Sequence, residues 1–440
     1  MLETIRNAWK VQETRKKLLY TLLIIFIFRI GSVLVPAPFL DTQVLGEWMS
    51  ANSENNALGY LNLFSGGSMS KATVFALSIQ PFINASIIVQ LLTYALPPLE
   101  RLSKEGEEGR KKIDKISSIV SLVLAVFMAF AYYLTMKNAK AVTYRTGFEG
   151  VFAAVVIMAV FITGAMAVVW LGNRVNEKGI GNGVSILIFT GIIANGPSAI
   201  VSMIEAAKNK PNPYVFVDLF VLILAVFIIG FIVFMNESER RIPIQYAKRV
   251  VGRKQYGGQS THIPIKVCMS GVMPIIFANA FVSLPMTIAL FFPPNTNGTS
   301  WWDKFYAGFT QIFSYRSPVY AVVLFFLIIG FNYFYVSMQY NPVEIANNLR
   351  QSNGGIPGIR PGKPTSDYIQ RVLSKITLVG AVFLGIIAVI PSIFGAIFPD
   401  LGNLALGGTS ILIVVGVALE TVQQLESQLV MRHYKGFLEK

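Results

Sequence analysis

Residues that could support catalysis, redox chemistry or metal binding are few in this chain and far apart. The 440 residues include a single cysteine, Cys268, and two histidines, His262 and His433. A lone cysteine excludes an intramolecular disulfide and a CxxC motif, and two distant histidines do not supply the ligands of a zinc site. The sequence contains no plausible catalytic constellation, so we expect neither enzymatic activity nor a cofactor.

Two glycine-rich stretches superficially resemble phosphate-binding loops. The stretch EKGIGNGVS begins at Glu177, but no strand precedes it and apolar stretches flank it. The stretch GRKQYGG, which begins at Gly252, lacks the spacing of a Walker A loop. We interpret the first as a tight turn that opens a helix, and we expect no nucleotide site in either.

Ionisable residues within the apolar stretches are also rare. Arg29 lies in the first of these stretches, and Glu420 lies in the last. Ion-coupled transporters usually place ionisable groups at the centre of the membrane. Their scarcity argues against a secondary transporter, although an uncoupled carrier needs none.

Small polar side chains occupy the middle of two apolar stretches instead. Gln80 and Asn84 lie in one stretch, and Asn279 and Ser283 lie in another. Such residues can join helices inside a membrane. They can also line an interface that parts and tolerates water or another peptide. The pattern alone favours helix packing.

A half-polar, glycine-rich segment leads directly into one of these stretches. Residues 61–73 read LNLFSGGSMSKAT, and an apolar run begins at Val74. Gly66 and Gly67 each lower helix propensity by about 1 kcal/mol. Irregular or polar backbone is tolerated at membrane depth only where protein or water surrounds it. We therefore do not expect this segment to form a stable helix that faces lipid.

The elements that must position these residues are apolar helices. Hydrophobic residues make up 53% of the chain and charged residues only 14%, with a mean hydropathy of +0.56; soluble proteins carry about 25% charged residues. A helix that crosses a bilayer needs about 20 apolar residues. We therefore predict an all-α integral membrane protein with ten transmembrane helices, at residues 18–35, 74–96, 116–136, 150–171, 183–204, 214–235, 270–292, 317–338, 373–396 and 409–427.

The distribution of positive charge orients these helices. The net charge is +14, and the segments 1–17, 97–115, 172–182, 236–269, 339–372 and 428–440 hold 27 Lys and Arg, whereas the other connections hold 8. The positive-inside rule then places both termini in the cytoplasm. The first helix follows a basic start but no cleavage motif, so we expect it to be retained. Ten helices divide into halves of five, and an odd-numbered unit repeated once inverts its topology.

The connections 236–269 and 339–372 are long and rich in Arg, Lys, Gly and Pro. The second contains GGIPGIRPGKPT, with three prolines and four glycines. Basic loops can simply determine topology or contact anionic lipid. A loop that supplied only charge would not need this shape, so we favour a docking surface. Arg and Lys also contact phosphates, so nucleic acid could form part of the partner.

Long motifs give the chain a resemblance to a known family along nearly its whole length. It resembles the SecY family, the channel subunits of the bacterial Sec protein translocase. The motifs are NLFSGGSMSKATVFALSIQPFINASIIVQLL, EKGIGNGVSILIFTGIIA, ERRIPIQYAKRVVGRKQYGGQSTHIPIKV, NPVEIANNLRQSNGGIPGIRPGKPT and GGTSILIVVGVALETVQQLESQLVMRHYKGFL. The resemblance implies two inverted pseudo-symmetric halves, residues 1–213 and 214–440, around an hourglass pore. The form YGGQSTHIPIKV suggests a bacterial origin.

The family's pore has a plug and a constriction that match named residues of this chain. Residues 61–73 match the plug, a short re-entrant helix that fills the external funnel of the resting channel; the matching residues are Asn62, Phe64, Ser65, Gly66, Gly67 and Ser68. The constriction is a ring of apolar side chains, which here are Ile83, Ile87, Val184, Ile188, Ile276 and Ile413. Without the resemblance, these aliphatic residues would be assigned to the protein core or to a lipid-facing surface.

The resemblance also implies a lateral gate and a docking surface. The gate lies between the helices at 74–96 and 270–292, and its polar residues are Gln80, Asn84, Asn279 and Ser283. Asn84 departs from the Ser of many relatives. The docking surface for the ribosome and the motor ATPase SecA comprises Arg240, Arg241, Lys248, Arg249, Arg253, Lys254 and Arg360.

The function implied is a passive, gated channel that translocates unfolded polypeptides across the bacterial cytoplasmic membrane and releases membrane helices laterally into it. Implied partners are the SecE and SecG membrane subunits, SecA, the ribosome with its RNA, signal sequences, nascent polypeptides and lipids. Two other classes are a small-molecule secondary transporter of similar build and a structural membrane scaffold. Few central charges and long cytoplasmic loops favour the channel over the transporter, and a scaffold would not need the plug-like segment.

Overall fold

The computed structural model is mostly helical. It describes residues 6–438 except 7, 53–61, 63–64, 145, 199–200, 202–212, 247–248, 252–253, 257–259, 290–300, 313–316 and 398–407. The helices are α2 (Gln12–Val33), α3 (Thr42–Asn52), α5 (Gln80–Ala95), α6 (Pro97–Lys104), α7 (Glu107–Asn138), α8 (Gly147–Lys178), α9 (Gly183–Ala194), α11 (Pro213–Glu237), α12 (Met273–Ala289), α13 (Trp301–Ile312), α14 (Pro318–Gln339), α15 (Pro342–Gln351), α16 (Lys363–Ile397) and α17 (Gly408–Leu438).

A helix occupies each of the ten predicted stretches at least in part. In the described part of the chain, α7, α8, α14, α16 and α17 contain helices that are long and apolar enough to cross a membrane. The pair α5 and α6 is a sixth candidate, but it bends by 100° at the break between the two helices. Shorter apolar helices lie within α9, α11 and α12.

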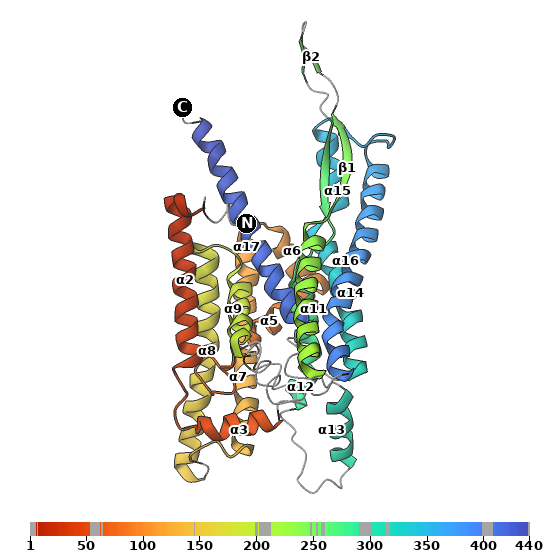
Figure 1. Ribbon diagram of the computed structural model, residues 1–440. Helices are drawn as coiled ribbons and strands as arrows, with labels where there is room; N and C mark the ends of the chain where they lie inside the picture. Colours follow the sequence, from red (N-terminus) through yellow and green to blue (C-terminus); the bar gives the residue numbers. More distant parts are fainter. Residues whose placement is uncertain are drawn as a thin grey trace.

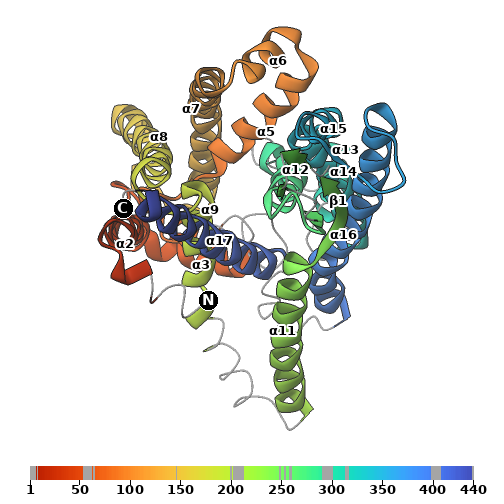
Figure 2. The same ribbon diagram turned by 90° about the horizontal axis from the view of Figure 1, so that it is seen from above.

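The long helices form two groups with α17 between them. Seen from above, α2, α7, α8 and α9 lie on one side, and α12, α14, α15 and α16 lie on the other (Figure 2). α17 packs against α9 of the first half and against α11 and α16 of the second. The side view shows most of these helices running along one common direction (Figure 1).

The largest buried cluster draws aliphatic side chains from both halves of the chain. It includes Phe28 of α2, Ile188 of α9, Ile232 of α11, Ile328 of α14 and Leu384 of α16. The outer faces of the same helices are also apolar, which is expected where the surrounding solvent is lipid. Phe26 of α2, Phe227 of α11 and Phe326 of α14 are between 66% and 67% exposed.

The predicted helix at 74–96 begins later than expected. Residues 65–79 form turns, and α5 starts at Gln80 with Pro81 in its first turn, where a missing N–H costs nothing. Ala72 and Ser78 have positive φ angles of 46° and 49°, which a helix cannot contain. The backbone pairs instead with the chain after α2, where the N–H of Val74 donates to the carbonyl of Val35 at 2.9 Å.

The expected all-α fold is wrong in the long basic connections, which contain strands. β1 (Glu239–Tyr246) pairs antiparallel with β4 (Ser260–Lys266) and with β5 (Gly354–Gly355), and β2 (Arg249–Val251) pairs with β3 (Lys254–Tyr256). Ile242 and Ile244 of β1 are buried while the residues between and beside them are exposed, so one face of the strand enters a small core with α15 and α16.

Candidate functional site

The six aliphatic residues expected at a constriction belong to one buried cluster. Ile83, Ile87, Ile188, Ile276 and Ile413 are at most 4% exposed, and the half-buried Val184 packs against the same cluster. They come from α5 and α9 in the first half and from α12 and α17 in the second. This set therefore joins the two halves through side chains that offer no polar atom.

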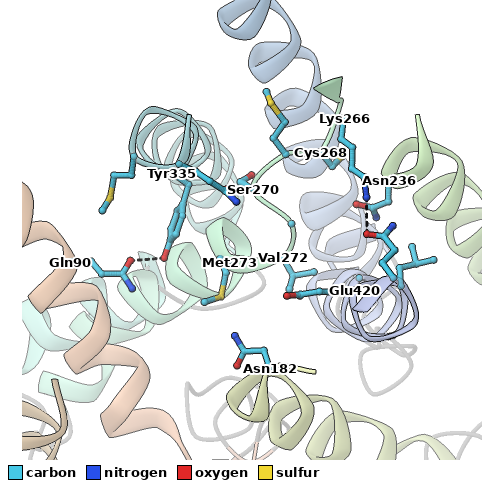
Figure 3. A pocket seen from close by; sticks show the side chains of 17 residues that line it. Gln90, Asn182, Asn236, Lys266, Cys268, Ser270, Val272, Met273, Tyr335 and Glu420 are labelled. Atoms are coloured by element: carbon cyan, nitrogen blue, oxygen red, sulfur yellow. Dashed lines mark hydrogen bonds between the residues drawn. The ribbon is translucent and has the colours of Figure 1, made fainter. Parts of the chain in front are cut away.

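A chamber of about 540 Å³ opens on one side of this cluster. Gln90 follows Ile83 by seven residues on α5, and Glu420 follows Ile413 by seven residues on α17, so each lies on the same helix face about 10 Å further along. Lys266, at the end of β4, also lines the chamber (Figure 3). The chamber therefore lies on the same side of the constriction as the sheet.

Polar contacts cross the chamber wall and connect the two halves. The hydroxyl of Tyr335 on α14 donates to Oε1 of Gln90 on α5 at 2.7 Å (Figure 3). One turn away, the rings of Tyr94 and Phe334 meet edge-on with centroids 5.7 Å apart. We define these two contacts as the α5–α14 clasp. No sequence motif marks the residues of the clasp, although Gln90 lies seven positions after Ile83 and so on the same helix face.

The plug-like segment lies on the other side of the constriction, because it precedes α5, whose first turn carries Ile83. Among its described residues, Asn62 is helical and residues 65–72 form turns, so the expected short helix does not extend through residues 65–73. Ser65 and Ser68 are buried, and their hydroxyls bond to carbonyls within the segment at 3.0 and 2.7 Å. The side chain of Asn62 accepts from the N–H of Ser70 at 2.8 Å. Phe64 lies outside the described residues.

Neighbouring helices hold this segment mainly through its backbone. The buried Tyr132 of α7 donates its hydroxyl to the carbonyl of Met69. Arg29 of α2 approaches the carbonyl of Gly66 at 3.5 Å. Gly66 has a φ of +68°, and a Cβ at this position would lie 3.0 Å from Cα of Gly191 on α9, so both its conformation and its contact favour glycine. The described contacts tie Gly67 and the residues around it to three helices of the first half.

The expected gate residues are buried where α5 packs against α12. Gln80, Asn84, Asn279 and Ser283 are 2–8% exposed. Within the described part of the chain, Oε1 of Gln80, Oδ1 of Asn84 and both side-chain amide atoms of Asn279 lack hydrogen-bond partners. Each unsatisfied buried group costs about 1–3 kcal/mol. The contact between these two helices is therefore weaker than its burial suggests.

The expected docking residues that the structure describes lie in the two sheets of the long connections or just beyond β5. Arg240 and Arg241 are exposed on β1, and Arg241 pairs with Glu239 at 2.6 Å. Arg360 is exposed just beyond β5, which pairs with the same strand, so the two long connections form one module. Arg249 and Lys254 lie in β2 and β3. Lys248 and Arg253 fall outside the described residues.

Comparisons of the sequence identify relatives along the whole chain. The SecY family model matches residues 73–422. Proteins described as protein translocase subunit SecY from Mycobacterium bovis and Mycobacterium tuberculosis are 41% identical over 450 residues, covering all of both chains. The SecY subunit of Streptomyces coelicolor is 40% identical over 453 residues, again covering both chains in full.

Comparisons of the structure identify the same fold. A structure described as a protein conducting channel matches with a TM-score of 0.62 at 18% identity, covering 94% of this chain and 93% of the other. The Sec61 chain of a canine ribosome-channel complex matches with a TM-score of 0.59 at 17% identity and the same coverage. Both matches show that this chain shares the fold of these structures.

Proposed function

The chain belongs to the SecY family, and from that premise we propose that the chamber, the constriction and the plug-like segment form the path of an unfolded polypeptide. The protein is a multi-pass membrane protein and a subunit of a protein-conducting channel. One observation carries the proposal most directly: along α5, the chamber, the apolar constriction and the segment at 65–79 follow one another in order. A chain that passes through must meet them in this sequence.

The constriction acts as the seal. A narrow ring of apolar side chains excludes water and ions, because a hydrophobic passage of this kind dewets. Its residues, Ile83, Ile87, Val184, Ile188, Ile276 and Ile413, offer no hydrogen bond to a passing backbone. The ring can therefore yield around a polypeptide without binding it.

The plug-like segment closes the resting pore and leaves during translocation. Tyr132 and Arg29 hold its backbone, and both contacts are single hydrogen bonds or weaker. A net hydrogen bond contributes about 1 kcal/mol. Such a segment is fixed well enough to seal the pore and weakly enough to move.

The lateral gate opens between α5 and α12. The unpaired amide oxygens of Gln80 and Asn84 on α5, and the unpaired amide of Asn279 on α12, gain partners when water or a peptide enters. Ser283 is buried on the same helix as Asn279. An apolar helix in the gate can then move into lipid, driven by about 25 cal/mol for each Å² of apolar surface removed from water. This step would release membrane helices and signal sequences sideways.

Partners supply the energy from the side of the sheet. Arg240, Arg241 and Arg360 form a basic, exposed module that suits the ribosome with its RNA or the motor ATPase SecA. A structural neighbour comes from a ribosome-channel complex, which supports the first of these partners. SecE and SecG would complete the channel in the bacterial cytoplasmic membrane, with both termini in the cytoplasm.

The full architecture follows from the same premise. Ten transmembrane helices would form two inverted halves, residues 1–213 and 214–440, around an hourglass pore. The burial of one cluster between the halves and the presence of helices in all ten stretches support this arrangement.

A reconstitution experiment tests the function. Vesicles that contain the chain with SecE and SecG, supplied with SecA and ATP, should protect a signal-bearing precursor from added protease. The same precursor without its signal sequence should remain accessible. Equal protection of both precursors, or of neither, would contradict the proposed function.

A further inference from the structure

The chamber has one charged side chain that the proposed pathway does not yet use. Gly416, Leu419, Glu420 and Gln423 of α17 line it, with the spacing of a single helix face. Glu420 is half-buried and lies two turns beyond the constriction residue Ile413 on that face. A polypeptide that approaches the constriction from the chamber must pass its carboxylate.

The carboxylate of Glu420 forms no hydrogen bond or ion pair in the described part of the chain. Lys266 is the other charged residue among those that line the chamber, but its ammonium donates to Oε1 of Gln423 at 2.7 Å (Figure 3). A half-buried charge without a partner is unfavourable and favours the arrival of a cation. The site is therefore complementary to a positively charged side chain.

The remaining wall of the chamber fits an apolar segment of variable sequence. Met269, Met273 and Met338 line it together with Val272 and Leu419. Methionine side chains are flexible and polarisable, so they adapt to different apolar partners. The α5–α14 clasp forms the opposite edge of the chamber through Gln90 and Tyr335. An occupant of the chamber thus lies next to the contact that must break for the lateral gate to open.

A charged start followed by an apolar stretch is the pattern of a secretory signal sequence. We propose that the chamber is a binding subsite for the start of a signal sequence, in which Glu420 binds a Lys or Arg of the charged region while the methionines contact the first apolar turn. This inference rests on the proposed function, because it assigns a role in that pathway. Glu420 is thus a specificity-determining residue that favours precursors with a basic start.

The test compares two precursors in the reconstituted vesicles. They are identical except that the Lys and Arg residues before the apolar stretch are replaced by Gln in one of them. The measurement is the ratio of their initial export rates, basic to neutral, in the parent channel and in Glu420→Gln. The matched control is Glu426→Gln, which removes a carboxylate from α17 outside the chamber.

We expect Glu420→Gln to lower the ratio by about threefold, the size of effect that one partly solvated charge pair produces. Glu426→Gln should leave the ratio at the parent value. Lys266→Gln should raise the ratio, because it removes the positive charge in the chamber that repels a basic start. This opposite change keeps the proposal testable if Glu420→Gln does not assemble.

Two results would count against the idea in different ways. If the parent exports both precursors but none of the chamber variants changes the ratio, the subsite assignment is wrong and the proposed function stands. If the parent exports neither precursor under conditions where a SecY relative does, the proposed function itself fails.

Discussion

In the channel that we propose, the aliphatic side chains at the constriction control ion permeability through their volume. Ile83, Ile188 and Ile276 come from three different helices and are 2–4% exposed in one buried cluster. Any ion that crosses must pass between them without a polar partner. A smaller side chain at each position would leave a passage that water can fill.

Replacing Ile83, Ile188 and Ile276 together by Ala should make the resting channel conduct ions. The three truncations widen the constriction, and a wider passage no longer dewets. Single-channel recording in planar bilayers measures the effect. Ile157→Ala, which opens a cavity in a separate buried cluster of α8 and its neighbours, is the control and should not conduct. If the resting ion conductance of the triple variant equals that of the parent, the assignment of these residues to the ring is wrong.

Charge reversal at Arg360 should reduce export driven by SecA by at least about tenfold and leave the fold intact. Arg360 is exposed in a loop beyond β5, and exposed substitutions usually change stability by about 0.5 kcal/mol or less. A docking partner that binds Arg360 presents negative charge to it. In Arg360→Glu this negative charge would face a carboxylate and be repelled. The control is Arg371→Glu, an exposed arginine on α16 of the same module. Export at the parent rate by Arg360→Glu would exclude this residue from docking.

Some functional residues could be found from the sequence and others could not. Ile83 and Ile87 share a helix face by their spacing, and the same rule extends to Gln90. Tyr335 could not be linked to Gln90, because the two are 245 positions apart and meet only after folding. Glu420 was evident as a rare charge in an apolar stretch, but its place in a chamber required the structure.

At the scale of elements, tertiary contacts override one local pattern, and a second local pattern was overlooked. Residues 74–79 are apolar and suggest helix, yet they pack as turns against α8, where a Cβ on Gly164 would come within 1.9 Å of the Val74 carbonyl oxygen. In the stretch ERRIPIQY, Ile242 and Ile244 are two positions apart and point to one face of a strand, a short pattern that the basic residues before it made easy to overlook. The helical stretches themselves were predicted well because their long apolar character is dominant.

Removing one hydroxyl should loosen the plug-like segment. Tyr132→Phe deletes the hydrogen bond to the Met69 carbonyl, which costs about 1 kcal/mol and shifts the seated fraction by roughly fivefold. The variant should show more frequent brief ion currents at rest. Tyr133→Phe is the control: Tyr133 is the adjacent buried tyrosine. If both variants seal as well as the parent, Tyr132 does not hold the segment.

Weakening the α5–α14 clasp should favour lateral opening. Tyr335→Phe removes the hydrogen bond to Gln90 between the two halves, so export of a precursor with a weakened signal sequence should rise by about fivefold. Tyr333 of the same helix donates to the Ser374 carbonyl at 3.2 Å, entirely within the second half. Tyr333→Phe should therefore have no such effect. Equal export by both variants would mean that the clasp does not restrain the gate.

At the scale of the whole molecule, the two halves meet across a largely apolar and poorly hydrogen-bonded interface. One buried cluster spans both halves, and among the described residues Oδ1 of Asn84 and both side-chain amide atoms of Asn279 remain without a hydrogen-bond partner. Such an interface excludes water but can still separate, because apolar contacts are non-directional and few hydrogen bonds must break. This interface supports the proposal that the channel stays closed to ions and opens between α5 and α12.

Cross-linking α5 to α12 tests this account most directly. Cysteine pairs are introduced between the two helices at positions whose Cα atoms lie within about 7 Å, after Cys268→Ser removes the buried free thiol. The measurement is export of a signal-bearing precursor into vesicles before oxidation, after oxidation and after reduction. We predict that oxidation stops export and that reduction restores it, whereas a pair placed within α14 and α16 of the second half has no effect. Full export through a verified cross-link between α5 and α12 would contradict the account, because the chain would then work with its gate fixed shut.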